Sequence, residues 1–113
     1  MNGISPQLQN QITQFQQVQQ QLQNVTAQKN NMDGQRREMQ RTLDELAKAD
    51  GTVYRNVGSI MVQVKDVDAL KAEMEESIEL MDVRINALER QENGLKEKYQ
   101  VLQETINNAM GNQ

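Results

Sequence analysis

Hydrophobic side chains recur with a seven-residue period along the first half of the chain. They occupy most a and d positions of a heptad that places Leu8 at position a, and the positions between them are mainly Gln, Asn, Arg and Glu. A stripe of two apolar positions in every seven is typical of a coiled-coil helix. Ser5 is suited to cap this helix, Pro6 to begin it, and Gly51 to follow its end. The pattern predicts a helix over residues 6–49.

The same heptad pattern returns after the middle of the chain. Aliphatic residues again fill most a and d positions, with Asp66 or Asp68 as the candidate N-cap and Gly111 as the candidate end. A second helix is therefore predicted over residues 66–110. Two helices of similar length joined by a short connector most simply pack antiparallel. We predict a mainly α fold, with residues 1–113 forming one domain built as a long antiparallel two-helix coiled coil.

Lys29, Arg36 and Glu92 are charged residues at a positions inside the two stripes. Charged groups at such positions are typical of devices that fix the register of a coiled coil, and we interpret them in this way rather than as active groups. Gly34 and Gly94 fall at outward positions, where each should cost about 1 kcal/mol relative to Ala. They are either tolerated surface glycines or the site of a bend.

The connector over residues 52–64 lacks a helical stripe. It is rich in β-branched residues, and its second half alternates aliphatic side chains on one face, as a strand does. Residues 56–58 suit a three-residue turn with Gly58 in the left-handed conformation. The connector is therefore predicted to be a central β-hairpin.

An isolated hairpin is marginally stable in water, and both of its strands are edges with unpaired backbone groups. The apolar side chains of this hairpin exceed what two helix ends can cover. We expect hairpins from several chains to join into an oligomeric β-barrel, while the alternative is a hairpin that folds onto its own helices as a closed tip. The predicted assembly residues are Val53, Tyr54, Val57, Gly58, Ile60, Met61, Val62 and Val64.

Neither residues 1–28 nor residues 105–113 contain a charged side chain. In an antiparallel pair these segments meet at the end remote from the hairpin, and Ile12 and Met110 fall at position e, beside the apolar stripe. An uncharged, partly apolar end suits weak binding of varied apolar segments, although the same residues also serve to close the coiled coil. The candidate binding residues at this tip are Ile4, Leu8, Ile12, Phe15, Ile106, Ala109 and Met110.

The composition excludes much chemistry. The chain has no His and no Cys, so thiol nucleophiles, imidazole bases and Cys/His zinc sites are excluded. A net charge of −4 gives no electrostatic reason to expect nucleic acid as a partner. We recognise no signal peptide and no membrane span. We expect a cytoplasmic protein that is not an enzyme and uses no cofactor and no metal.

Three stretches of the chain resemble the archaeal β subunits of prefoldin. Residues 14–22 are similar to their glutamine-rich first helix, residues 53–62 to their hairpin, and residues 88–92 to part of their second helix. The hairpin is the most specific of the three, because heptad repeats resemble one another. A single hairpin fits the β-type subunit, whereas α-type subunits carry two.

The resemblance implies a hexamer of two α-type and four β-type subunits whose hairpins form a double β-barrel platform. It implies that the arm tips hold unfolded client proteins and pass them to a group II chaperonin without ATP. The tip would then bind clients, and residues 53–64 would form the assembly surface. The alternative is a structural coiled-coil scaffold or tether without chaperone activity, although a scaffold needs no β segment midway.

Overall fold

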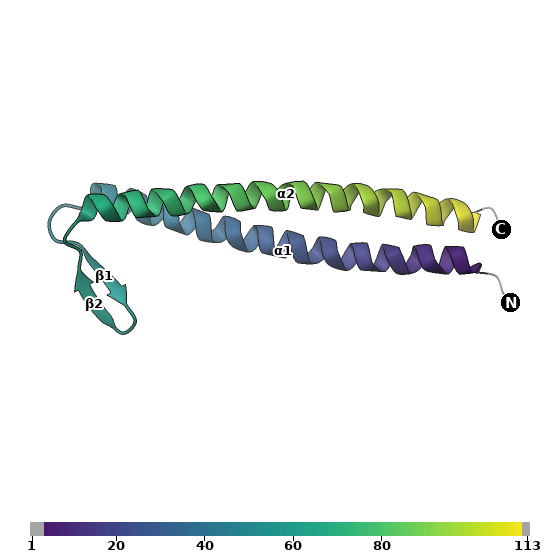
Figure 1. Ribbon diagram of the computed structural model, residues 1–113, viewed down its shortest axis with the longest axis horizontal. Coiled ribbons are helices and arrows are strands. Elements are labelled where there is room, and N and C mark those ends of the chain that lie inside the picture. The colour runs from purple at the N-terminus through teal and green to yellow at the C-terminus, as the bar shows by residue number, and fades with distance from the viewer. Residues whose placement is uncertain (1–3, 112–113) are drawn as a thin grey trace. The chain divides into compact units, whose positions relative to one another are not determined.

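The computed structural model describes residues 4–111 and contains two long helices joined by a β-hairpin (Figure 1). The elements follow in the order α1 (Pro6–Lys48), β1 (Tyr54–Val57), β2 (Ile60–Gln63) and α2 (Val67–Gly111). The predicted mainly α fold with a central hairpin is confirmed. Each predicted helix boundary lies within one residue of the observed one.

Polar side chains cap the first turn of each helix. The Leu8 N–H donates to the Ser5 hydroxyl at 3.1 Å, and the Ala69 N–H donates to the Asp66 carboxylate at 3.0 Å. These bonds satisfy backbone donors that have no partner within the helix. After α1, Gly51 adopts a φ of 100°, a conformation that favours glycine, as predicted.

The described residues divide into two compact units, one formed by residues 4–30 and 86–111 and the other by residues 31–85. In the first unit, Lys29 contacts Glu92 while Phe15 contacts Tyr99. Residue numbers therefore fall along α1 as they rise along α2, so the two helical segments run antiparallel.

In the second unit, Arg36 pairs with Asp82, whereas Met39 and Met74 line one groove closer to the hairpin. The helical segments of this unit are therefore antiparallel as well. In both units the a and d positions from Leu8 to Ala109 are buried or half-buried. The predicted heptad assignment is confirmed, because the stripe it defines is the one the helices bury against each other.

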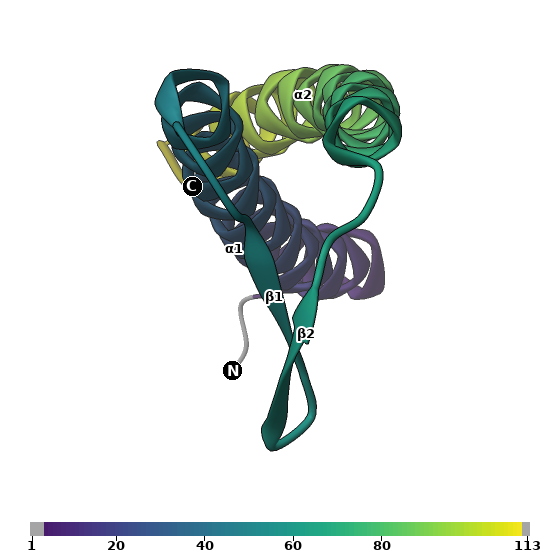
Figure 2. The same cartoon turned by 90° about the vertical axis from the view of Figure 1, so that its left-hand side faces the viewer.

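The two strands of the hairpin are antiparallel, and they pair Tyr54 with Gln63 and Val57 with Ile60. Their ladder continues toward the helices, where the Val64 N–H donates to the Val53 carbonyl at 2.8 Å. Figure 2 shows the strong twist of this two-stranded ribbon.

The turn of the hairpin is shorter than the sequence suggested. Because Val57 pairs with Ile60, the loop contains only Gly58 and Ser59, and the predicted three-residue loop is wrong. The predicted left-handed glycine is correct, since Gly58 has a φ of 61°. Glycine at the first position of a two-residue loop matches the twist of the flanking strands.

Candidate functional site

The strand pairing gives the hairpin one strongly apolar face. Residues that pair across an antiparallel ladder share a face, and alternate residues along each strand point the same way. The pairs Val57–Ile60, Arg55–Val62 and Val53–Val64 therefore lie on one side, which carries five aliphatic side chains and one arginine. The opposite side carries Tyr54, Asn56, Met61 and Gln63.

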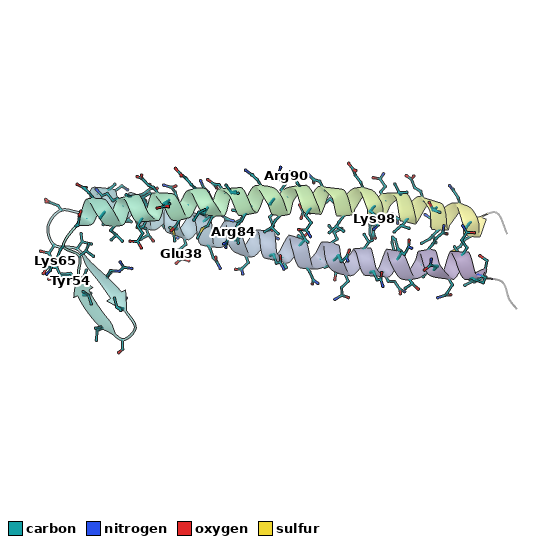
Figure 3. The ribbon with its side chains drawn as sticks, viewed as in Figure 1. Glu38, Tyr54, Lys65, Arg84, Arg90 and Lys98 are labelled. Atoms are coloured by element: carbon teal, nitrogen blue, oxygen red, sulfur yellow. The ribbon has the colours of Figure 1, made fainter. Side chains whose placement is uncertain are left out.

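The helices leave this hairpin largely uncovered. No residue of either strand is buried, and the large apolar side chains of the strands are 40–69% exposed. Only Val53 and Val64, next to the helices, are half-buried. Figure 3 shows Tyr54 and Lys65 at this base of the hairpin. The alternative interpretation required the hairpin to fold onto its own helices as a closed tip, and this exposure contradicts it.

Both strands of the hairpin are also edge strands. Among residues 4–111 the sheet contains β1 and β2 alone, so each strand has one side without a hydrogen-bonding partner strand. Edges of this kind are templates for pairing with another chain, and natural proteins normally protect them. An exposed apolar face together with two open edges makes the hairpin a candidate interface for other subunits.

The predicted tip residues differ in how much of their surface is exposed. Leu8 is buried, and Ile4 and Met110 are exposed. The remaining four residues are half-buried: Ile12, Phe15, Ile106 and Ala109. Leu8 therefore closes the coiled coil, whereas Met110 and its half-buried neighbours offer apolar surface to a ligand.

Four of these residues line one groove between α1 and α2 in the first unit. The groove has a volume of about 410 Å³. Its lining consists of Ile12, Phe15, Gln16, Gln19, Gln103, Ile106, Asn107 and Met110. Beside it, the rings of Phe15 and Tyr99 are tilted by 32° with centroids 4.6 Å apart, an aromatic contact that fixes the Phe15 ring. The groove thus joins apolar and amide side chains without a charged group.

A buried polar cluster lies deeper in the same unit, around the seam residue Glu92. The Thr26 hydroxyl donates to Glu92 Oε2 at 2.6 Å, and Lys29 Nζ donates to Oε1 at 2.9 Å. Lys96 Nζ lies 3.7 Å from Oε1. The Glu92 side chain is only 4% exposed. The hydrogen bond from Thr26, followed by that from Lys29, lowers the pKa of Glu92 from 4.5 to about 2.

A second ion pair joins the helices in the other unit. The Arg36 Nε donates to Asp82 Oδ1, and Nη2 lies 3.3 Å from Oδ2, so the contact is bidentate. The hydrogen bond with Asp82 raises the pKa of Arg36. Sequence reasoning singled out Arg36, Lys29 and Glu92 but missed two of their partners, Thr26 and Asp82. Both partners occupy position e, which flanks the seam, but this position alone does not identify them, because their pairing depends on the stagger of the two helices.

No helix within residues 4–111 is long and apolar enough to cross a membrane. In the same residues no group of three or more acidic side chains is placed to hold a metal ion.

These features define a coiled-coil protein with an exposed hairpin in the second unit and an uncharged groove in the first. Residues 9–113 match a protein family described as "Prefoldin subunit". The chain therefore belongs to the prefoldin family, which confirms the resemblance seen in the sequence. Prefoldin subunits are chaperones that act in hetero-oligomeric complexes.

Relatives and a solved structure agree with this assignment. The chain is 49% identical to the prefoldin subunit beta of Methanocella arvoryzae, over 98% of this chain and 89% of that protein. It is 42% identical to the corresponding subunit of Thermoplasma acidophilum, over 91% of this chain and 85% of the relative. The crystal structure of the prefoldin beta subunit from Thermococcus strain KS-1 superposes with a TM-score of 0.84, at 40% identity and 96% coverage of both chains.

Proposed function

We propose that this chain is the β-type subunit of an ATP-independent holdase in the cytoplasm. Its hairpin joins other hairpins in a β-barrel platform, in a hexamer of two α-type and four β-type chains. Its tip binds non-native proteins, which the complex delivers to a group II chaperonin. The proposed site binds and releases non-native proteins and performs no catalysis.

The observation that carries client binding is the groove at the tip. A holdase must bind many sequences, so its site needs apolar surface that does not depend on a particular charge pattern in the ligand. The groove meets this need, because Ile12, Phe15, Ile106 and Met110 supply apolar surface and no charged residue lines it. Methionine is flexible and adapts its shape to different partners.

The assembly part of the proposal rests on the hairpin. Its apolar face and open edges are exposed in the single chain. Burial between subunits would remove the apolar face from water and pair the backbone groups of the edges. A coiled-coil scaffold or tether would need neither the hairpin face nor the groove.

The test is to place charge in the groove and measure client protection. Ile12→Glu combined with Met110→Glu should leave the oligomer intact and reduce, several-fold, its ability to suppress aggregation of a chemically denatured protein diluted into buffer without ATP. Val101→Glu is the matched control, because Val101 is an exposed apolar residue of α2 outside the groove. Light scattering measures protection, and native mass spectrometry checks assembly.

Unchanged protection in the doubly substituted oligomer would show that the groove does not bind clients. If Ile12→Glu disturbs the helices, as circular dichroism would reveal, Met110→Glu alone still tests the proposal, because Met110 is exposed.

A further inference from the structure

The groove at the tip is built from matching parts of both helices. Each helix contributes two apolar side chains, from Ile12 and Phe15 on α1 and from Ile106 and Met110 on α2. Each helix also contributes two amide side chains, and these are Gln16 and Gln19 on α1 and Gln103 and Asn107 on α2. Half of the lining residues are therefore amides.

The heptad positions separate these two kinds of side chain. Ile12 and Met110 occupy position e, and Gln19 and Gln103 occupy the same position one heptad further from the chain ends. Gln16 and Asn107 occupy position b, further from the seam. An apolar end of the groove is thus followed by an amide end, with amides also along its rim.

The four amide groups are available to a ligand. All four residues are exposed, and none of their side chains hydrogen bonds to another residue among residues 4–111. A side-chain amide offers two N–H donors and a carbonyl acceptor, so it can bind either a backbone N–H or a backbone C=O.

A non-native polypeptide differs from a folded one in its backbone as well as in its exposed apolar side chains. In a folded protein nearly all buried backbone groups are paired, whereas an unfolded segment carries unpaired N–H and C=O groups bound to water. Drawing such a segment into an apolar groove removes that water, and each polar group left without a partner is costly. A groove with amides beside its apolar surface avoids this cost.

We propose that the amide side chains of Gln16, Gln19, Gln103 and Asn107 hydrogen bond to the main chain of an extended client segment. The client's apolar side chains then contact Ile12, Phe15, Ile106 and Met110. This inference rests on the proposed client-binding function and specifies its chemistry. The ligand is an extended peptide whose backbone carries unpaired hydrogen-bonding groups, and its recognition requires apolar side chains but no particular sequence and no ion pairs.

The experiment measures peptide affinity of the assembled oligomer containing the full chain. Two fluorescent peptides with the same alternating apolar sequence are used, one unmodified and one N-methylated at alternate backbone amides. The variant combines Gln16→Met with Gln103→Met, because Met matches the length of Gln and also favours helix. Gln100→Met is the control, an exposed glutamine of α2 outside the groove.

We expect the variant to bind the unmodified peptide about tenfold more weakly than the native oligomer, from the loss of two neutral hydrogen bonds. We expect the N-methylated peptide, which has lost backbone donors, to suffer a smaller loss. The Gln100→Met oligomer should bind both peptides like the native one.

Equal or tighter binding of the unmodified peptide by the variant would overturn the inference, because a purely apolar site gains surface when Gln becomes Met. Equal losses for both peptides would overturn hydrogen bonding to the client's backbone N–H groups, because N-methylation removes those donors and leaves the carbonyls in place. Those outcomes leave client binding itself intact. If the native oligomer binds neither peptide, the proposed function fails, and this inference fails with it.

Discussion

The exposed hairpin allows a quantitative prediction about assembly. Replacing Ile60 and Val62 by Asp should leave the helices folded and prevent the oligomer from forming. In the single chain Ile60 is 60% exposed and Val62 is 40% exposed, and the proposed assembly would cover these fractions. Full burial of such a side chain is worth roughly 1.5–3 kcal/mol. Covering the exposed fractions therefore contributes about 1.5 kcal/mol for Ile60 and about 1 kcal/mol for Val62.

Loss of about 2.5 kcal/mol weakens an association step by about 70-fold. The carboxylate introduced at position 60 adds a desolvation penalty of several kcal/mol when the face is buried, whereas the carboxylate at position 62 lies opposite Arg55 across the ladder. Because every copy of this chain would carry the defect, we expect complete loss of the oligomer at micromolar concentrations. The expected loss of assembly comes from the changed sheet face and not from unfolding. Both side chains are already exposed in the monomer, so replacing them costs the monomer little stability.

Sedimentation velocity and native mass spectrometry measure the assembly, and circular dichroism measures the helices. The matched control is Leu80→Asp with Val83→Asp, a pair that is 60% and 64% exposed on α2, outside the hairpin. Persistence of the oligomer in the Ile60 and Val62 variant would refute the reasoning. Loss of the oligomer in the control as well would show that assembly is not confined to the hairpin.

Further predictions concern the stability of the coiled coil. Because Glu92 has a folded-state pKa of about 2, below its ordinary value of 4.5, it contributes stability that is fully present above about pH 4.5 and is lost as the pH falls toward 2. Thermal unfolding across this pH range should show the loss, and Glu92→Gln should flatten the profile; an equally steep profile in that variant would contradict the assignment. Separately, Gly34→Ala and Gly94→Ala should each stabilise the chain by about 1 kcal/mol in urea unfolding, because a Cβ at either position meets no neighbour. Destabilisation by either change would indicate that the glycine has a role the single chain does not reveal.

The sequence was sufficient to predict the helices and their buried stripe. Heptad periodicity reports directly which face of a helix is apolar, and caps such as Ser5 and Asp66 act through bonds to residues only three positions away. The turn was predicted less well, because Asn56, Val57 and Gly58 are compatible with two loop lengths. Cross-strand pairing, which places Val57 opposite Ile60, decides between them.

Side-chain partners across the seam could not be read from periodicity alone. The charges of Lys29 and Glu92 identify them as candidates for pairing, but their contact depends on the relative stagger of α1 and α2, which no local pattern specifies. Thr26 is harder still, because a neutral hydroxyl at position e has no electrostatic signature until it lies 2.6 Å from a buried carboxylate. The cluster therefore both results from the stagger and stabilises it.

The same limit explains why the groove was predicted only in its apolar half. Ile12 and Met110 attract attention because they lie beside the stripe, where an apolar residue is unexpected. Glutamines on a helix surface look ordinary, since Gln favours helix and is well solvated. Only the pairing of α1 with α2 brings Gln16 and Gln103 to the same groove as these apolar residues. A surface that distinguishes unfolded from folded chains by their backbones needs both kinds of side chain, and the hydrophobic pattern of the sequence reveals only the first.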